Sequence, residues 1–211
     1  MYLNKVSILL SFLLLEFCVF AMQPDIKLKA KYAEIAYATP EIKYARTKRD
    51  WEFLYYVSKN RMDRVQGLID QDFNVNIKDH DDIKALETAI YNNSPDMVKL
   101  LVRNGACIEK GDLRKAITWG KDKAAKALIK LGVDVNFKKL EFSESILIRV
   151  VWEMSASEQL KHIIPILIRK GADRSCTFFG NTAYDYANKR KNKDGGWDAK
   201  LLELLKPKIK I

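Results

Sequence analysis

The sequence has 211 residues, 48% of them hydrophobic and 30% charged, which is enough for one domain with an elongated core. The formal net charge of +10 is concentrated at the two ends, because segments 22–50 and 189–211 carry +3 and +5 and segment 51–188 only +2. The chain has two histidines but no nucleotide-binding glycine loop, paired metal-ligand motif or nucleophile elbow, which excludes the familiar catalytic classes.

Residues 1–21 are predicted to form a secretory signal peptide. Lys5 gives a weakly positive start, residues 6–15 are apolar apart from Ser7 and Ser11, and Val19-Phe20-Ala21 provides small or β-branched residues for cleavage. The mature protein would then be exported to the periplasm or the extracellular space. An uncleaved N-terminal membrane anchor is the alternative, although the apolar run is short for a membrane span.

Segment 22–50 is predicted to be an N-terminal helical cap or a linker. Apolar residues between 28 and 36 fall at helical spacing, and Pro40 should end that helix. A second short helix is expected at 42–49. The following apolar stretch at 53–57 needs cover, which favours a cap. A disordered basic linker is the alternative.

From residue 51 onward the same pattern recurs: the apolar end of a helix, a glycine or its substitute, and a polar tail. Asp72, Gly105, Gly132 and Gly171 occupy the glycine position at spacings of 33, 27 and 39 residues. A period near 33 is typical of stacked helical repeats. The third unit is six residues short before Leu113, which predicts a finger truncated to a tight turn. The fourth carries about five extra residues between its two helices.

These units resemble ankyrin repeats. Segment 79–89 stands where that family has D-x-x-G-x-T-P-L-x-x-A, and Gly180-Asn181-Thr182 is a cleaner version of the same motif. The resemblance covers roughly 50–205 and suggests an exported ankyrin-repeat protein of bacterial or endosymbiont type. It implies an all-α, ankyrin-like helical repeat solenoid of about five units. The expected segments are a signal peptide (1–21), a linker or helical N-terminal cap (22–50), repeats (51–78, 79–109, 110–136, 137–175 and 176–205) and a basic tail (206–211).

No catalytic, cofactor-binding or metal site is predicted. The acidic cluster around His80 lies at an expected finger tip, where aspartate is common in turns. A nucleophilic role for Cys107 or Cys176 lacks an identifiable base. The two cysteines belong to units two stacking steps apart, about 20 Å, which is too far for a disulfide. We therefore predict a non-enzyme and a monomer.

The resemblance implies a protein–protein interaction scaffold that binds a partner through its concave face. Exposed aromatic residues grouped on one face are typical of binding hot spots, although Trp119 and Trp152 would alternatively pack between inner helices. The register places these residues on the concave face: His80, Asp81, Ile83, Tyr91, Asn92, Thr118, Trp119, Glu141, Phe142, Trp152, Glu153, Phe178, Phe179, Lys189 and Arg190.

Phe178 and Phe179 are the best predicted anchors, because they precede the turn of the last unit. A C-terminal helix folded over them would instead make them part of a cap. The alternative function is docking on an anionic membrane or polymer surface through the basic ends 22–50 and 189–211, with the repeats as a spacer. Salt dependence separates the two functions, and no specific nucleic acid is expected.

Overall fold

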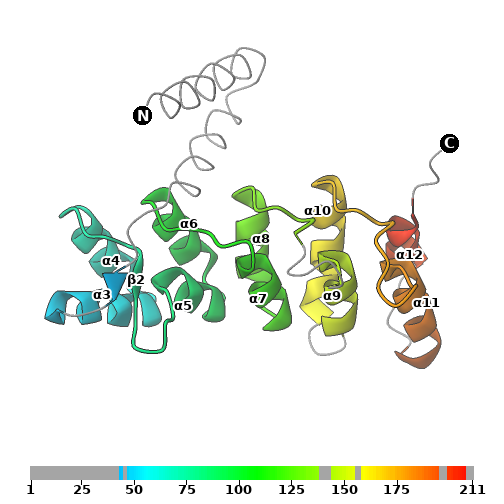
Figure 1. The fold of residues 1–211 in the computed structure, drawn as a ribbon, viewed down its shortest axis with the longest axis horizontal. Coiled ribbons are helices and arrows are strands. Elements are labelled where there is room, and N and C mark those ends of the chain that lie inside the picture. Colours follow the sequence, from blue (N-terminus) through cyan, green and yellow to red (C-terminus); the bar gives the residue numbers. More distant parts are fainter. Residues whose placement is uncertain (1–42, 45–46, 138–143, 155–157, 195–198, 208–211) are drawn as a thin grey trace, which may run out of the picture.

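The computed structural model describes residues 43–44, 47–137, 144–154, 158–194 and 199–207. Within these residues the fold is an all-α repeat solenoid of five helix pairs that stand side by side in one row (Figure 1). The inner helices are α3 (Lys48–Ser58), α5 (Ala85–Tyr91), α7 (Asp112–Thr118), α9 (Ile146–Glu153) and α11 (Ala183–Asp194). The outer helices are α4 (Met62–Ile69), α6 (Pro95–Arg103), α8 (Asp122–Lys130), α10 (Ile164–Arg169) and α12 (Ala199–Leu205).

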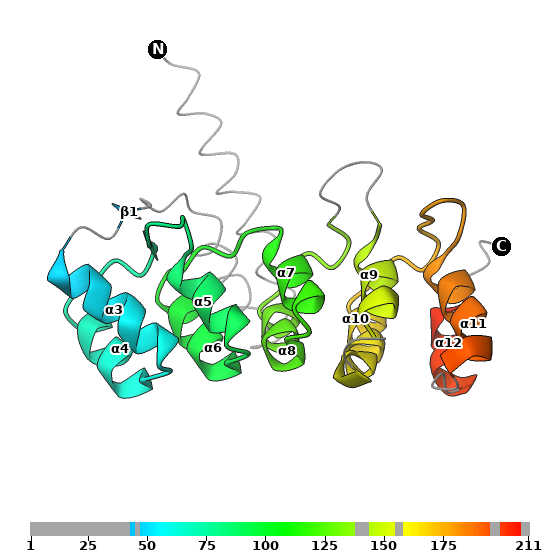
Figure 2. The same ribbon diagram turned by 90° about the horizontal axis from the view of Figure 1, so that it is seen from below.

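The inner helices line one side of the row and the outer helices the other (Figures 1 and 2). Each outer helix buries an apolar stripe, which in α6 consists of Met97, Val98, Leu101 and Val102. Small alanines at the core position of the inner helices are fully buried and allow close helix packing. These are Ala89, Ala116 and Ala187. No helix in the described parts of the chain combines the length and apolar character needed to cross a membrane.

The predicted glycine positions end the outer helices in the left-handed conformation. Gly105, Gly132 and Gly171 have φ angles of +90°, +93° and +83°. Asp72 adopts φ +56° at the same place in the first unit, so the aspartate does substitute for glycine there. Aspartate is one of the few residues other than glycine that adopts this conformation readily, because its short side chain can hydrogen-bond to the local backbone.

Two asparagines fix the register between neighbouring units. The Asn76 Nδ2 donates to the Gly105 carbonyl at 2.8 Å, and its Oδ1 accepts from the Cys107 N–H at 2.8 Å. Asn136 makes the same pair of hydrogen bonds to Gly171 and Asp173, at 2.9 and 2.8 Å. The asparagine at the end of one unit's polar tail therefore hydrogen-bonds a backbone carbonyl and a backbone N–H in the turn of the next unit. These two groups would otherwise lack partners.

The third and fourth units depart from the regular length at the places that the sequence predicts. Helix α7 begins seven residues after Gly105, whereas α5 begins thirteen residues after Asp72, so the missing six residues come from the finger. In the fourth unit the extra length lies between α9 and α10, where a 3₁₀ helix, η1 (Glu158–Ile163), precedes α10.

The expected helix at 42–49 is wrong at its first residues. Strand β1 (Lys43–Tyr44) pairs in parallel with β2 (Ile77–Lys78) of the first finger. Helix α3 begins only after Thr47, whose hydroxyl accepts from the Asp50 N–H while the Asp50 carboxylate accepts from the Thr47 N–H. This capping box sets the helix start, because it satisfies two backbone N–H groups that have no partner within the helix. The predicted cap at 22–42 lies outside the described residues.

Candidate functional site

The candidate site is the inner face, which we define as the exposed surface of the inner helices together with the fingers that connect the units. Four large hydrophobic side chains are exposed among the described residues: Trp51, Tyr55, Tyr91 and Phe179. Trp51 and Tyr55 lie on α3, Tyr91 lies at the end of α5, and Phe179 lies in the last finger. All four therefore belong to the inner face, three of them in the first two units and Phe179 at the other end of the row.

At the N-terminal end of this face, Tyr91 packs edge to face against Trp119, with ring centroids 5.6 Å apart. Trp119 is half-buried against the core, so it packs between the second and third units. Tyr91 remains 59% exposed, and the Lys121 ammonium lies 4.6 Å from its ring centroid. Tyr55 is 57% exposed and has Lys59 5.8 Å above its ring. Each exposed tyrosine thus carries a neighbouring cation.

At the C-terminal end, Trp152 stands edge to face with Phe178 and with Tyr186, both at 5.4 Å. The Tyr186 hydroxyl donates to the Phe178 carbonyl at 2.8 Å, and Arg190 donates to the Trp152 carbonyl at 3.0 Å. Trp152 and Phe178 are both half-buried against the core. They form the packing between the fourth and fifth units, so these two rings are not free anchors.

Phe179 contacts Phe178 edge to face, with ring centroids 4.4 Å apart, but differs from it in exposure and backbone conformation. Its side chain is 85% exposed, and its backbone has φ +45°. It is followed by Gly180 at φ +73°, and Phe178 and Asn181 exchange two backbone hydrogen bonds of 2.9 and 3.0 Å across these residues. Two central residues with positive φ form the type I′ pattern, for which Asn-Gly is the preferred sequence. Phenylalanine is therefore strained at this position.

The other predicted residues are spread along the inner face. His80 is exposed, and its ring lies against that of Trp51 in a tilted arrangement with centroids 4.6 Å apart. The Asp79 carboxylate accepts from the Asp81 and Ile83 N–H groups at 2.9 Å, which is the turn chemistry expected of the acidic cluster. The remaining residues lie on inner helices or at their ends: Asn92, Thr118, Glu153, Lys189 and Arg190. Glu141 and Phe142 lie outside the described residues.

No metal-binding group of three histidine, cysteine, aspartate or glutamate residues occurs in the described parts of the chain. Cys107 and Cys176 are not joined by a disulfide, and each is half-buried.

The sequence interpretation missed Trp51, Tyr55 and the two lysines beside the tyrosines. A signal for Trp51 and Tyr55 was present, because they stand one helical turn apart. Phe53, Leu54 and Val57 form the buried stripe of the same helix. Residues off the buried stripe of an amphipathic helix are the ones left to face solvent.

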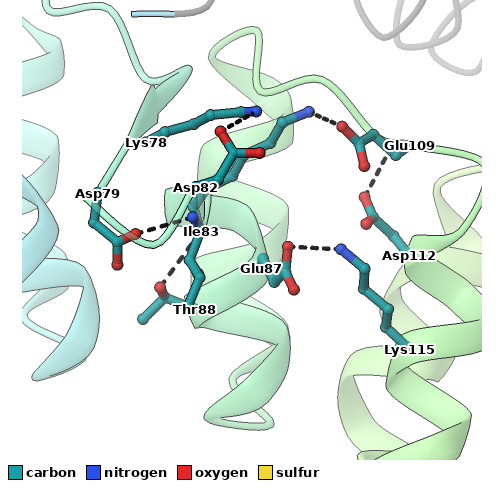
Figure 3. A network of polar contacts seen from close by, with 10 residues as sticks. Lys78, Asp79, Asp82, Ile83, Glu87, Thr88, Glu109, Asp112 and Lys115 are labelled. Carbon is teal, nitrogen blue, oxygen red and sulfur yellow. Dashed lines mark hydrogen bonds and ion pairs between the residues drawn. The ribbon is translucent and has the colours of Figure 1, made fainter. Parts of the chain in front are cut away.

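A network of ion pairs joins the fingers of the second and third units (Figure 3). Its two pairs between units, Lys84 with Glu109 and Lys115 with Glu87, were not anticipated, because their members are 25 and 28 residues apart and meet only once the units stack. Its contacts are the ion pairs Lys78 with Asp82 at 2.7 Å, Lys84 with Glu109, and Lys115 with Glu87 at 2.6 Å, together with a hydrogen bond of 2.8 Å from the Glu109 N–H to the Asp112 carboxylate. The network holds the short finger against its longer neighbour.

Lowering the pH from 7 to about 5 should stabilise the fold through Asp112. Burial raises the pKa of this carboxyl from 3.8 to about 6, although the hydrogen bond from the Glu109 N–H and the charge of Lys115 oppose the rise. The folded state therefore binds the proton more tightly, and stability increases as the pH falls through 6 until the unfolded chain is also protonated. Glu109, whose pKa is held below 4.5 by the hydrogen bond from Lys84, loses its contribution only at lower pH.

Asp112→Asn tests this prediction, because the amide has the same shape, keeps an oxygen acceptor for Glu109 and does not titrate. We expect its free energy of unfolding at pH 7 to exceed that of the wild type by about 1–3 kcal/mol, since one pKa unit corresponds to about 1.4 kcal/mol. The variant should change little between pH 7 and 5. Urea denaturation of both proteins at pH 7, 6 and 5 measures the difference, and parallel pH profiles would contradict the assignment.

Comparison with known families agrees with the geometry. A family model of ankyrin repeats, in three copies, matches residues 53–139. A search of curated proteins gives no match. The fourth and fifth units lie largely beyond the matched range, yet they repeat the same plan of inner helix, outer helix and left-handed turn. The chain therefore contains ankyrin repeats, and the repeat solenoid of its described residues is the fold that such repeats form.

Proposed function

We propose that this protein is a non-catalytic scaffold that binds another protein through its inner face, with Phe179 as an anchor. Ankyrin repeats are generally protein–protein interaction modules, and the family is typically non-catalytic. The observation that carries the proposal is the conformation of Phe179, a strained turn residue with an 85% exposed ring.

The fold alone does not favour phenylalanine at this position. A non-glycine residue in the left-handed region costs about 1–2 kcal/mol, and asparagine would adopt the same turn with less strain. Leaving the ring in water forgoes about 1.5–3 kcal/mol that burial would provide. Strain of this kind persists at binding sites, where the residue serves a ligand and not the fold.

The turn also holds the ring in a fixed place. The Asn181 side chain donates to the Phe179 carbonyl at 2.8 Å, and Lys189 donates to the Asn181 Oδ1 at 2.7 Å. Phe178 beneath it is packed against Trp152. An aromatic anchor on a rigid turn loses little conformational entropy on binding, which favours a role as a hot spot.

Phe179→Asn should separate binding from folding. Because asparagine suits a left-handed turn followed by glycine, we expect the variant to be more stable than the wild type by about 1 kcal/mol. Because the ring is lost, its affinity for the partner should fall about tenfold or more. The partner is first isolated with wild-type protein from the native source, and its affinity for each variant is then measured by calorimetry.

Two further variants serve as controls. Phe179→Tyr keeps a ring at the same place and should retain most of the affinity, whereas Phe179→Ala should lose affinity without the gain in stability. A Phe179→Asn protein that binds the partner as tightly as the wild type would overturn the proposal. Binding that weakens steeply as salt is raised, and that the Phe179 substitutions leave unchanged, would instead favour docking on an anionic surface through the basic ends.

A further inference from the structure

A polar groove lies at the end of the inner face opposite the fingers, where the inner and outer helices of the first two units are joined. Its volume is about 660 Å³. The lining residues come from the turns of units one and two and from the start of α8: Ser58, Lys59, Asn60, Asn92, Asn93, Ser94, Pro95, Asp96 and Lys123. Tyr55 and Tyr91, both exposed, stand close in sequence to these lining residues.

The charges of this groove are unbalanced. Within the described residues, the lining lysines Lys59 and Lys123 make no ion pair, and neither does Lys121, which lies outside the lining two residues before Lys123. The nearby carboxylates already have cationic partners, because Asp96 pairs with Lys99 at 2.8 Å and Asp122 with Lys126 at 3.1 Å. The groove therefore presents free positive charge beside exposed tyrosine rings.

Stability of the helices does not explain these lysines. Lys121 is the N-cap of α8 and Lys123 lies in its first turn, where the helix dipole favours negative charge. The Lys121 ammonium lies 4.6 Å from the centre of the Tyr91 ring, and Lys59 lies 5.8 Å from that of Tyr55. Cations held beside aromatic rings can receive a carboxylate while the rings receive an apolar side chain.

We infer that this groove binds an acidic segment of the partner protein, with its carboxylates against Lys59 and Lys123 and an adjacent apolar side chain against Tyr91. The inference rests on the proposed function and names the chemistry of the partner at one end of the inner face. Charge complementarity selects the acidic segment, because a basic or neutral one would leave the lysines without partners.

A library of random twelve-residue peptides, displayed and selected on the purified wild-type protein, identifies what the groove binds without knowledge of the natural partner. We expect the selected peptides to be enriched in aspartate or glutamate next to an aromatic or large aliphatic residue. Their synthetic versions should bind less tightly as salt is raised, since the carboxylates remain partly solvated. Selected peptides without acidic residues, or no binding peptides at all, would overturn the inference.

Charge reversal locates the site. Lys59→Glu/Lys123→Glu should weaken binding of the synthetic acidic peptide about tenfold or more, and Tyr91→Ala should weaken it as well. Lys130→Glu/Lys170→Glu is the matched control, because it makes the same change in net charge at exposed lysines outside the groove. Equal losses in the two double variants would show a general effect of net charge and would exclude this groove.

The result can be distinguished from a failure of the proposed function. Phe179→Asn should leave the affinity of the acidic peptide unchanged. Phe179 lies in the fifth unit, whereas the groove is lined by residues of the first, second and third units. If charge reversal at the groove has no effect while Phe179→Asn still abolishes binding of the isolated partner, the groove inference fails and the scaffold function stands. Circular dichroism on heating verifies that each variant is folded.

Discussion

Replacing Leu101, Leu128 or Leu167 by alanine should lower the free energy of unfolding by about 2–4 kcal/mol in each case. The three leucines occupy the same position on successive outer helices, four residues before the glycine, and all are fully buried. Their carbonyls accept hydrogen bonds from the residue after that glycine, at 2.9, 3.4 and 3.0 Å, and alanine retains those bonds. The loss therefore measures side-chain packing between the stacked units.

Urea denaturation followed by circular dichroism gives the three midpoints. Leu100→Ala is the control, because Leu100 is next to Leu101 on the same helix but only half-buried, so its loss should be smaller. Unchanged midpoints in all three variants would mean that the register is misassigned. A variant with a lower dependence on urea concentration would show that one unit unfolds before the others, as occurs when contacts are limited to neighbours.

Glu144→Gln should have a comparable effect, a loss of about 2–4 kcal/mol. The Glu144 side chain is 8% exposed, and its carboxylate accepts from the guanidinium groups of Arg114 and Arg149. A neutral amide would leave two largely buried cations, with the 3.2 Å contact from Arg149 to Glu153 as the remaining ion pair of the group. Removing one member of a buried ion group is costly, because the remaining charge is not solvated by water.

Glu158→Gln is the matched control for this substitution. Glu158 pairs with Lys161 at the start of η1, but its side chain is 76% exposed, so its loss should have little effect on the free energy of unfolding. Thermal and urea denaturation of both variants compare the two sites directly. Equal effects at positions 144 and 158 would show that burial does not set the strength of the Glu144 interactions.

Local chemistry was sufficient to predict much of the fold. The spacing of Gly105, Gly132 and Gly171 fixed the repeat, because a left-handed turn must follow every outer helix. The same reasoning identified Asp72 as the substitute in the first unit and located the shortening of the third finger. Each of these conclusions depends on residues within one unit, whose conformational preferences are readable along the chain.

Contacts between distant residues could not be predicted in this way. The pairing of residues 43–44 with 77–78, and the ion pair of Lys84 with Glu109, form only when separate segments are brought together by stacking. Such contacts depend on the exact placement of units relative to one another. A pattern of apolar residues records which face is buried, but it does not record which charged side chain lies opposite another.

The two phenylalanines of the last finger show the same division. The sequence placed Phe178 and Phe179 together at a turn before Gly180, and from that alone both were equally good anchors. The tertiary structure separated them, because Trp152 of the preceding unit covers Phe178, while the positive φ of Phe179 turns the chain and leaves its ring exposed. The sequence by itself determined the repeat and the turn; which ring remains in solvent depended on packing between units, since burial is a property of neighbours in space.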